Sequence, residues 1–141
     1  EFQHRWYVIG FSEEKGKVIT YALDRVSIIE ITEDTFTVET GFNPSNFFKY
    51  SFGITESKTS PDNIVLKFEL NQLGYLKTKP LHQSQIIEEF DNYFLLTLHI
   101  VPSFEFYEKL LSFGSRVQVV SPENVKTNLV QKITDSLANY Q

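Results

Sequence analysis

The sequence predicts an α+β fold in two parts: part of a small β-barrel, followed by a ferredoxin-like β-α-β-β-α-β unit with an added C-terminal helix. Three observations predict it. The N-terminal part contains period-two runs typical of strands, residues 64–120 alternate between strand and helix patterns, and the polar stretch TESKTSPDN separates the two. We therefore predict a barrel-like domain at residues 1–54, a linker at residues 55–63 and a second domain at residues 64–141.

A β-hairpin is predicted at the start of the chain. Residues 4–11 (HRWYVIGF) alternate between two faces and are rich in aromatic and β-branched residues, and residues 17–23 have the same character. The polar loop between them contains Gly16, which suits a longer hairpin connection. This hairpin sets an aromatic pair beside two arginines, Arg5 and Arg25.

Less regular elements follow the hairpin. Residues 26–31 are predicted to continue as a strand, and residues 36–40 form a further strand or an extension of it. A short helix is predicted to begin at Pro44, behind Asn43 as its N-cap. Together with the hairpin this gives three or four strands and a short helix, which fits part of a small β-barrel.

The second part begins with a clear strand pattern. Residues 64–70 alternate, so that four apolar side chains share the face predicted to be buried: Ile64, Leu66, Phe68 and Leu70. The elements predicted after this strand are a helix in residues 71–78, a hairpin of residues 85–90 and 93–101, a helix in residues 104–113 and a strand in residues 116–120. Their order is β-α-β-β-α-β.

Two helices have recognisable ends. Ser103 is the candidate N-cap of the first, which ends at Gly114 and is predicted to place Phe104, Tyr107 and Leu111 on one face, with Phe106 and Leu110 beside it. The last helix is predicted to begin with Ser121 as N-cap and Pro122 as its first residue. Its apolar residues recur at four-residue spacing, at Val125, Leu129, Ile133 and Leu137, with Val130 beside them. This stripe either packs on the chain's own sheet, which is the commoner arrangement, or forms a dimer seam.

Composition excludes several classes of protein. Of the 141 residues, 41% are hydrophobic and 15% aromatic, which is ample for a packed core, and the chain has no cysteine for a disulfide or a thiolate metal site. The formal net charge of −5 is spread evenly along the chain, so a broad basic face for duplex DNA is not expected. No apolar run is long enough to cross a bilayer and no signal pattern opens the chain, so we expect a cytoplasmic protein.

Four short motifs occur in order along the chain: Arg-Trp-Tyr-Val at residues 5–8, Leu-Asp-Arg-Val at residues 23–26, LSFGS at residues 111–115 and VQVVSP at residues 117–122. The first two resemble the WYL domain of bacterial transcriptional regulators, and the last two are similar to the C-terminal extension that follows WYL domains. The resemblance covers most of the chain. It implies an SH3-like (Sm-like) barrel in the first part and a role in transcription regulation.

The chain departs from the family pattern at its beginning. Members of the family carry further strands before the Trp-Tyr motif and usually a helix-turn-helix domain before those strands, whereas this chain begins beside the motif. A barrel that lacks its opening strands has an unpaired edge, which is unfavourable in water. We therefore expect a fragment of a longer regulator, with a helix-turn-helix domain outside this chain that contacts DNA.

Five residues are candidate ligand-binding residues: Arg5, Trp6, Tyr7, Tyr21 and Arg25. Arginine makes bidentate contacts with phosphate, and the rings of Trp and Tyr offer faces on which a base stacks. The resemblance implies that this region senses a ligand, which in some members is single-stranded DNA or a nucleotide-like effector.

A structural interpretation competes with this one. Trp6 then belongs to the barrel core, as most strand aromatics do, and Arg25 is an ion-pair partner of Asp24 or Glu30. Tyr7 and Tyr21 share a face with the arginines only if the strand register brings them there.

Catalytic and metal motifs are missing from the sequence. His4, His82 and His99 do not have the spacing of metal ligands, and the chain has no Gly-x-Ser-x-Gly motif and no glycine-rich phosphate loop. We predict a protein that is not an enzyme and that needs no metal or cofactor.

The function predicted from the sequence is a ligand-sensing regulatory region of a bacterial transcriptional regulator. It binds a nucleotide-like or single-stranded nucleic-acid effector, works as a homodimer, and controls a separate DNA-binding domain. The alternative is a protein–protein interaction or dimerisation module that has no small ligand.

Overall fold

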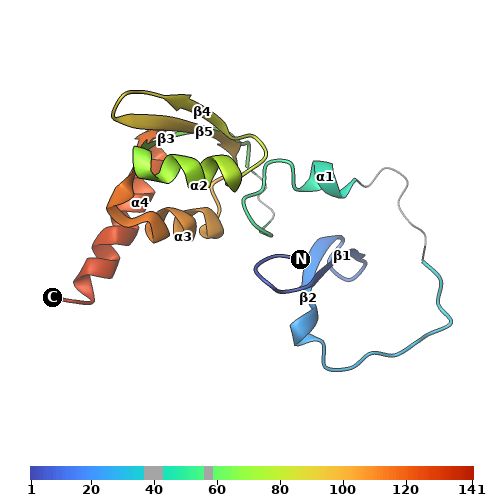
Figure 1. Cartoon of the computed structure of the whole chain (residues 1–141). Coiled ribbons are helices and arrows are strands. Elements are labelled where there is room, and N and C mark those ends of the chain that lie inside the picture. Colours follow the sequence, from blue (N-terminus) through green and yellow to red (C-terminus); the bar gives the residue numbers. More distant parts are fainter. Residues whose placement is uncertain (37–42, 56–58) are drawn as a thin grey trace. The chain divides into compact units, whose positions relative to one another are not determined.

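The computed structural model describes residues 1–36, 43–55 and 59–141 (Figure 1). The chain forms two compact units, Glu1–Asn43 and Pro44–Gln141. The described strands form one two-stranded and one four-stranded antiparallel sheet, accompanied by helices, so the predicted α+β class is confirmed. The domain limits expected at residues 54 and 64 stay a prediction.

The first unit contains the predicted hairpin. Strand β1 (Tyr7–Ser12) pairs antiparallel with β2 (Lys17–Ala22), and a 3₁₀ turn, η1 (Leu23–Arg25), follows. The connection between the strands uses Gly16 at φ 59°, a left-handed conformation that glycine adopts without steric cost.

The strand predicted over residues 26–31 is wrong. The chain is irregular there, and Ile28, Ile29 and Ile31 are 76%, 84% and 100% exposed. A β-branched run forms a strand only where a neighbouring strand satisfies its backbone, and none of the described residues does so. Most of the strand predicted over residues 36–40 lies outside the described residues. The SH3-like barrel therefore stays a prediction.

The second unit is built on a four-stranded sheet with the order β4-β5-β3-β6, in which every neighbouring pair is antiparallel. Helices α2 and α3 connect its strands, and Figure 1 shows both on the same side of the sheet. The predicted β-α-β-β-α-β order is confirmed. The bounds are β3 (Asp62–Glu69), η2 (Leu70–Gln72), α2 (Leu73–Thr78), β4 (Ile86–Glu89), β5 (Tyr93–Ile100), α3 (Phe104–Phe113), η3 (Gly114–Arg116) and β6 (Val117–Ser121).

The core of this unit lies between the sheet and its helices. Alternate residues of the two central strands are fully buried: Ile64, Leu66 and Phe68 from β3, and Phe94, Leu96, Leu98 and Ile100 from β5. The rings of Phe68 and Phe94 stack at a centroid distance of 5.4 Å. Leu70, which was expected to share the buried face, is 40% exposed because the strand ends at Glu69 and the chain turns into η2.

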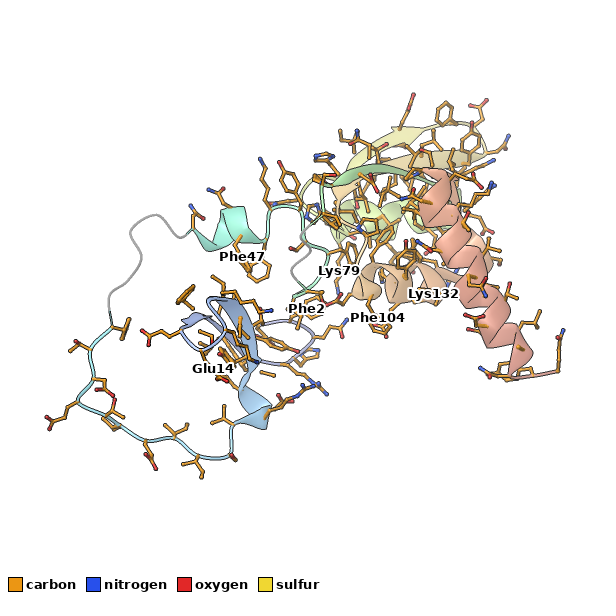
Figure 2. The ribbon with its side chains drawn as sticks, turned by 180° about the vertical axis from the view of Figure 1, so that it is seen from behind. Phe2, Glu14, Phe47, Lys79, Phe104 and Lys132 are labelled. Atoms are coloured by element: carbon orange, nitrogen blue, oxygen red, sulfur yellow. The ribbon has the colours of Figure 1, made fainter. Side chains whose placement is uncertain are left out.

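Helix α3 begins and ends as predicted. Ser103 is its N-cap, since its Oγ accepts a 3.2 Å hydrogen bond from the backbone N–H of Phe106, and Gly114 ends it at φ 58°. The predicted apolar face is partly wrong, because Phe104 is 64% exposed. It lies instead near Lys132 of the last helix, whose Nζ is 6.0 Å from its ring (Figure 2). The side chains that face the core are Phe106, Tyr107, Leu110 and Phe113.

Helix α4 (Glu123–Ala138) packs through its first half. Its N-cap is Pro122, not Ser121 as predicted, because Ser121 is still the last residue of β6 and pairs with Val65. Val125 and Leu129 are buried, whereas Val130, Ile133 and Leu137 are 54%, 50% and 54% exposed. The predicted apolar stripe is therefore divided between the unit's own core and its surface. None of the described helices is long and apolar enough to span a membrane.

A short segment before β3 attaches to the second unit. Helix α1 (Pro44–Phe47) begins at Pro44 as predicted. The backbone N–H of Val101 donates a 2.9 Å hydrogen bond to the carbonyl of Tyr50, and Ser51 and Val101 form a parallel bridge. The ring of Phe52 meets that of Phe106 edge-on at 5.3 Å. Residues 50–52 thus extend the packing at the end of β5.

Candidate functional site

The five candidate residues lie at the open end of the hairpin. Tyr7 pairs with Ala22, and the backbone N–H of Leu23 donates a 3.0 Å hydrogen bond to the carbonyl of Trp6. This pairing brings the start of β1 beside the end of β2 and η1. The residues that the pairing gathers at this end are Arg5, Trp6, Tyr7, Tyr21 and Arg25.

The register separates the two tyrosines. Tyr21 is opposite Val8, so it shares a face with Val8, whereas Tyr7 lies on the other face. Trp6 precedes β1, and the bond from Leu23 N–H to its carbonyl continues the pairing, so the alternation assigns Trp6 to the face of Val8. Trp6 is 63% exposed and Tyr21 45% exposed. Trp6 is therefore not a core residue in the described structure. Trp6 and Tyr21 instead form an exposed aromatic face.

The two arginines have different surroundings. The Arg5 Nε atom is 3.8 Å from Oδ2 of Asp24, and both side chains are about half exposed. An exposed pair of this kind contributes little to stability. Arg25, in η1, is exposed and has no ion pair with Asp24 or Glu30 in the described part of the chain.

A polar cavity in the second unit was missed by the sequence analysis. It has a volume of about 510 Å³ and is lined by Lys49, Tyr50, Gln83, Ser84 and His99, with Ser45 and Asn46 of α1 at its edge. These residues come from three separate stretches of sequence and form no motif. Only the attachment of residues 49–52 beside the end of β5 brings them together.

A hydrogen-bond network supports the cavity wall. The Ser84 Oγ atom accepts a 2.9 Å hydrogen bond from the backbone N–H of His99 and lies 2.8 Å from Nδ1 of His82. Nδ1 of His99 is 2.8 Å from Oδ1 of Asn63. Burial lowers the pKa of His82 below its usual 6.5, and the nearby His99 lowers it further. His82 is therefore held in its neutral form near pH 7.

Metal chemistry finds no support in the described residues. None of their His, Asp and Glu side chains form a group of three or more that could hold a metal ion. His82 and His99 lie close enough to influence each other, but their partners are a serine hydroxyl and an asparagine amide, not carboxylates.

Comparison with known proteins gives a family. Residues 60–137, more than half of the chain, match the family model of the WCX domain. No curated protein matches the chain. A solved structure similar to it is that of proteasome accessory factor B/C (PafBC) of Arthrobacter aurescens, at 18% sequence identity and a TM-score of 0.42, over 92% of this chain and 20% of that one. The chain thus spans about a fifth of that structure's length. The chain belongs to the WCX family, the C-terminal domain associated with WYL domains in transcriptional regulators.

Proposed function

We propose that the chain is a ligand-sensing region of a WYL-type regulator and that the open end of the β1–β2 hairpin binds the effector. The effector is a nucleotide-like molecule or a single-stranded nucleic acid. Its occupancy controls a DNA-binding domain, of the helix-turn-helix class, elsewhere in the regulator.

The exposed aromatic face of the hairpin carries the proposal. Trp6 and Tyr21 lie on one face and present 63% and 45% of their surface to solvent. Exposed aromatic rings offer faces on which bases stack, and base stacking on an aromatic ring contributes about 1–3 kcal/mol per base. Arg25 lies at the same end of the hairpin and supplies a positive charge for a phosphate.

Trp6 is the chain's only tryptophan, so its fluorescence reports directly on this face. We expect short single-stranded DNA or RNA to quench it saturably, and more weakly as salt rises, because phosphate contacts release counterions. Arg25→Ala should weaken binding about tenfold. It should also reduce the slope of log K against log salt concentration by about one, because one fewer phosphate is neutralised.

Lys15→Ala is the matched control, because Lys15 lies in the turn at the opposite end of the hairpin and the variant removes the same charge. It should bind like the unchanged protein. Equal losses of affinity in both variants would mean that binding depends only on the net charge of the chain. An absence of quenching in the folded protein would overturn the proposal. If Arg25→Ala unfolds the hairpin, the structural interpretation of Arg25 is correct instead.

A second candidate function, dimerisation, is favoured by helix α4. Val130, Ile133 and Leu137 expose about half of their surface, and a groove of about 480 Å³ lies beside them, lined by residues that include Leu111, Val117 and Ile133. A second copy of the chain that covers this surface would bury the part of the apolar stripe left outside the core.

Sedimentation at several concentrations tests this candidate. Leu137→Lys places a charge on the stripe without touching the buried residues of α4, so it should dissociate a dimer and leave the monomer folded. Lys126→Glu changes charge on the first half of the same helix and serves as the control. A chain that is monomeric at every concentration, with or without Leu137→Lys, would exclude dimerisation through this surface.

A further inference from the structure

The polar cavity of the second unit has the size of a small-molecule site. Its volume of about 510 Å³ falls within the range of about 300–1,000 Å³ typical of ligand pockets. One wall is the end of β5, at His99, and the other is the segment that carries Lys49 and Tyr50. The segment is fastened to the end of β5 by the 2.9 Å bond from the Val101 N–H to the Tyr50 carbonyl. A 3.1 Å bond from Gln83 Nε2 to the Lys49 carbonyl fastens it to the loop before β4.

The charge of the cavity is opposite to that of the chain. The whole chain has a formal net charge of −5, yet no Asp or Glu is among the described residues that line the cavity, and Lys49 is. The Lys49 ammonium lies 5.0 Å from the centre of the Tyr50 ring and forms no ion pair with any described carboxylate. Lys49 is exposed, so its ammonium is accessible to an anion that enters the cavity.

The remaining lining groups suit the rest of such a ligand. Gln83 Nε2 is bonded to the Lys49 carbonyl, which leaves the carboxamide oxygen of Gln83 as an acceptor at the cavity wall. Ser84 Oγ is bonded to the His99 N–H and lies beside His82 Nδ1, so it holds the wall in place. The rings of Tyr50 and His99 meet edge-on at 5.1 Å and give the cavity an aromatic corner. Because Nδ1 of His99 is engaged with Asn63 Oδ1, the ring is held in a fixed orientation with Nε2 left for a ligand.

We propose that this cavity is a second binding site, separate from the hairpin, for a small molecule that carries a phosphate or carboxylate group. Lys49 pairs with the oxyanion, while Gln83 and His99 orient the remainder of the ligand. Occupancy bridges residues 49–50 and the β5 end, so it strengthens the attachment of this segment to the sheet.

Histidine signals in an NMR spectrum give a direct test on the whole chain. The chain has three histidines, of which His99 lines the cavity, His82 lies behind it and His4 belongs to the other unit. With ¹³C-labelled histidine, adenosine 5′-monophosphate, inorganic phosphate and succinate are titrated separately at constant ionic strength and pH. We expect saturable shifts of the His99 and His82 ring signals with at least one of these anions, whereas the His4 signal reports on the hairpin site alone.

The three probes distinguish the possible sources of the oxyanion. Tighter binding of adenosine 5′-monophosphate than of phosphate identifies a phosphate monoester whose organic part fills the aromatic corner. Tighter binding of succinate identifies a carboxylate. Either result supports the site, provided that Lys49→Met weakens the binding about tenfold, as expected for the loss of a charged hydrogen bond.

Lys126→Met is the matched control, because it removes the same charge from the exposed surface of α4. It should leave the shifts unchanged. The proposal is overturned if no saturable shift occurs up to about 10 mM, where a complex with a Kd near 1 mM would be almost saturated. It is also overturned if Lys49→Met binds as well as the unchanged chain. Arg25→Ala should not change the His99 and His82 shifts, so the two proposed binding sites are tested independently.

Discussion

Thr55 Oγ1 donates a 2.6 Å hydrogen bond to Oε1 of Glu105, and this bond joins the segment after α1 to the first turn of α3. Ser103 strengthens the same junction, since its Oγ donates a 2.7 Å hydrogen bond to the carbonyl of Phe52. Gly53 lies between Phe52 and Thr55 in the sequence, and a β-carbon added to it would meet the Glu105 side chain at 3.0 Å. The start of α3 therefore fixes residues 52–55 on the second unit.

The pH dependence of this junction follows from Glu105. Burial raises the pKa of its carboxyl, but hydrogen bonds from donors that include Thr55 and its own backbone N–H lower the pKa by more, so that it lies below its usual 4.5. A depressed pKa means that the ionised carboxylate stabilises the fold above about pH 4.5. This stabilisation is lost as the pH falls through the lower pKa of the folded state.

Glu105→Gln should remove this pH-dependent stabilisation. We expect the free energy of unfolding of Glu105→Gln to be lower than that of the unchanged chain at pH 7, and the difference to shrink below pH 4.5. Urea unfolding at a series of pH values measures it. Glu108→Gln, an exposed position on the same helix, should show no comparable difference, and a constant difference at every pH would contradict the role given to the Glu105 charge.

Gly53→Ala should destabilise the second unit by about 1–2 kcal/mol, because Gly53 has φ 95° and an added methyl group meets the Glu105 side chain. Thermal unfolding followed by circular dichroism measures the change. Gly74→Ala is the control, since Gly74 lies in α2 with open space around it, and alanine should stabilise that helix by about 0.5–1 kcal/mol. Equal effects of the two substitutions would argue against the contact at Gly53.

The sequence predicts the second unit well because its patterns are local. The alternation around Phe68 and the caps at Ser103 and Gly114 each depend on a few neighbouring residues, and each is present in the structure. The face of α3 was harder to predict. Phe104 and Phe106 are equally apolar, and only the position of the sheet determines that Phe106 is buried.

The first unit and the cavity depend on long-range contacts that periodicity does not reveal. The run Val26–Ile31 has the composition of a strand, but a strand also needs a partner, and the described chain supplies none. The cavity joins Lys49 to His99 across 50 positions of sequence through bonds such as that from Gln83 Nε2 to the Lys49 carbonyl. The sequence also does not determine the hairpin register, and it is this register that places Tyr7 and Tyr21 on opposite faces.

Phe106 and Phe104 offer a matched test of the core. Phe106 is fully buried and contacts the rings of Phe52 and Tyr107, whereas Phe104, two residues earlier on the same helix, is 64% exposed. Phe106→Ala should lower the free energy of unfolding by about 3–5 kcal/mol. Phe104→Ala should lower it by less than about 1 kcal/mol in the same urea titration. A larger loss at Phe104 would mean that its surface is covered in solution, for example by a second chain.

Trp6 decides whether the hairpin face is open in solution. Since Trp6 is 63% exposed, iodide should quench its fluorescence almost as strongly as it quenches the urea-unfolded chain. Arg5 and Arg25 lie at the same end of the hairpin, so at low salt iodide should quench more than caesium does, and added salt should reduce this difference. Arg25→Ala should reduce it as well, while Lys15→Ala should not. If neither ion quenches the fluorescence, Trp6 is buried in solution, and the interpretation of Trp6 as a core residue is correct.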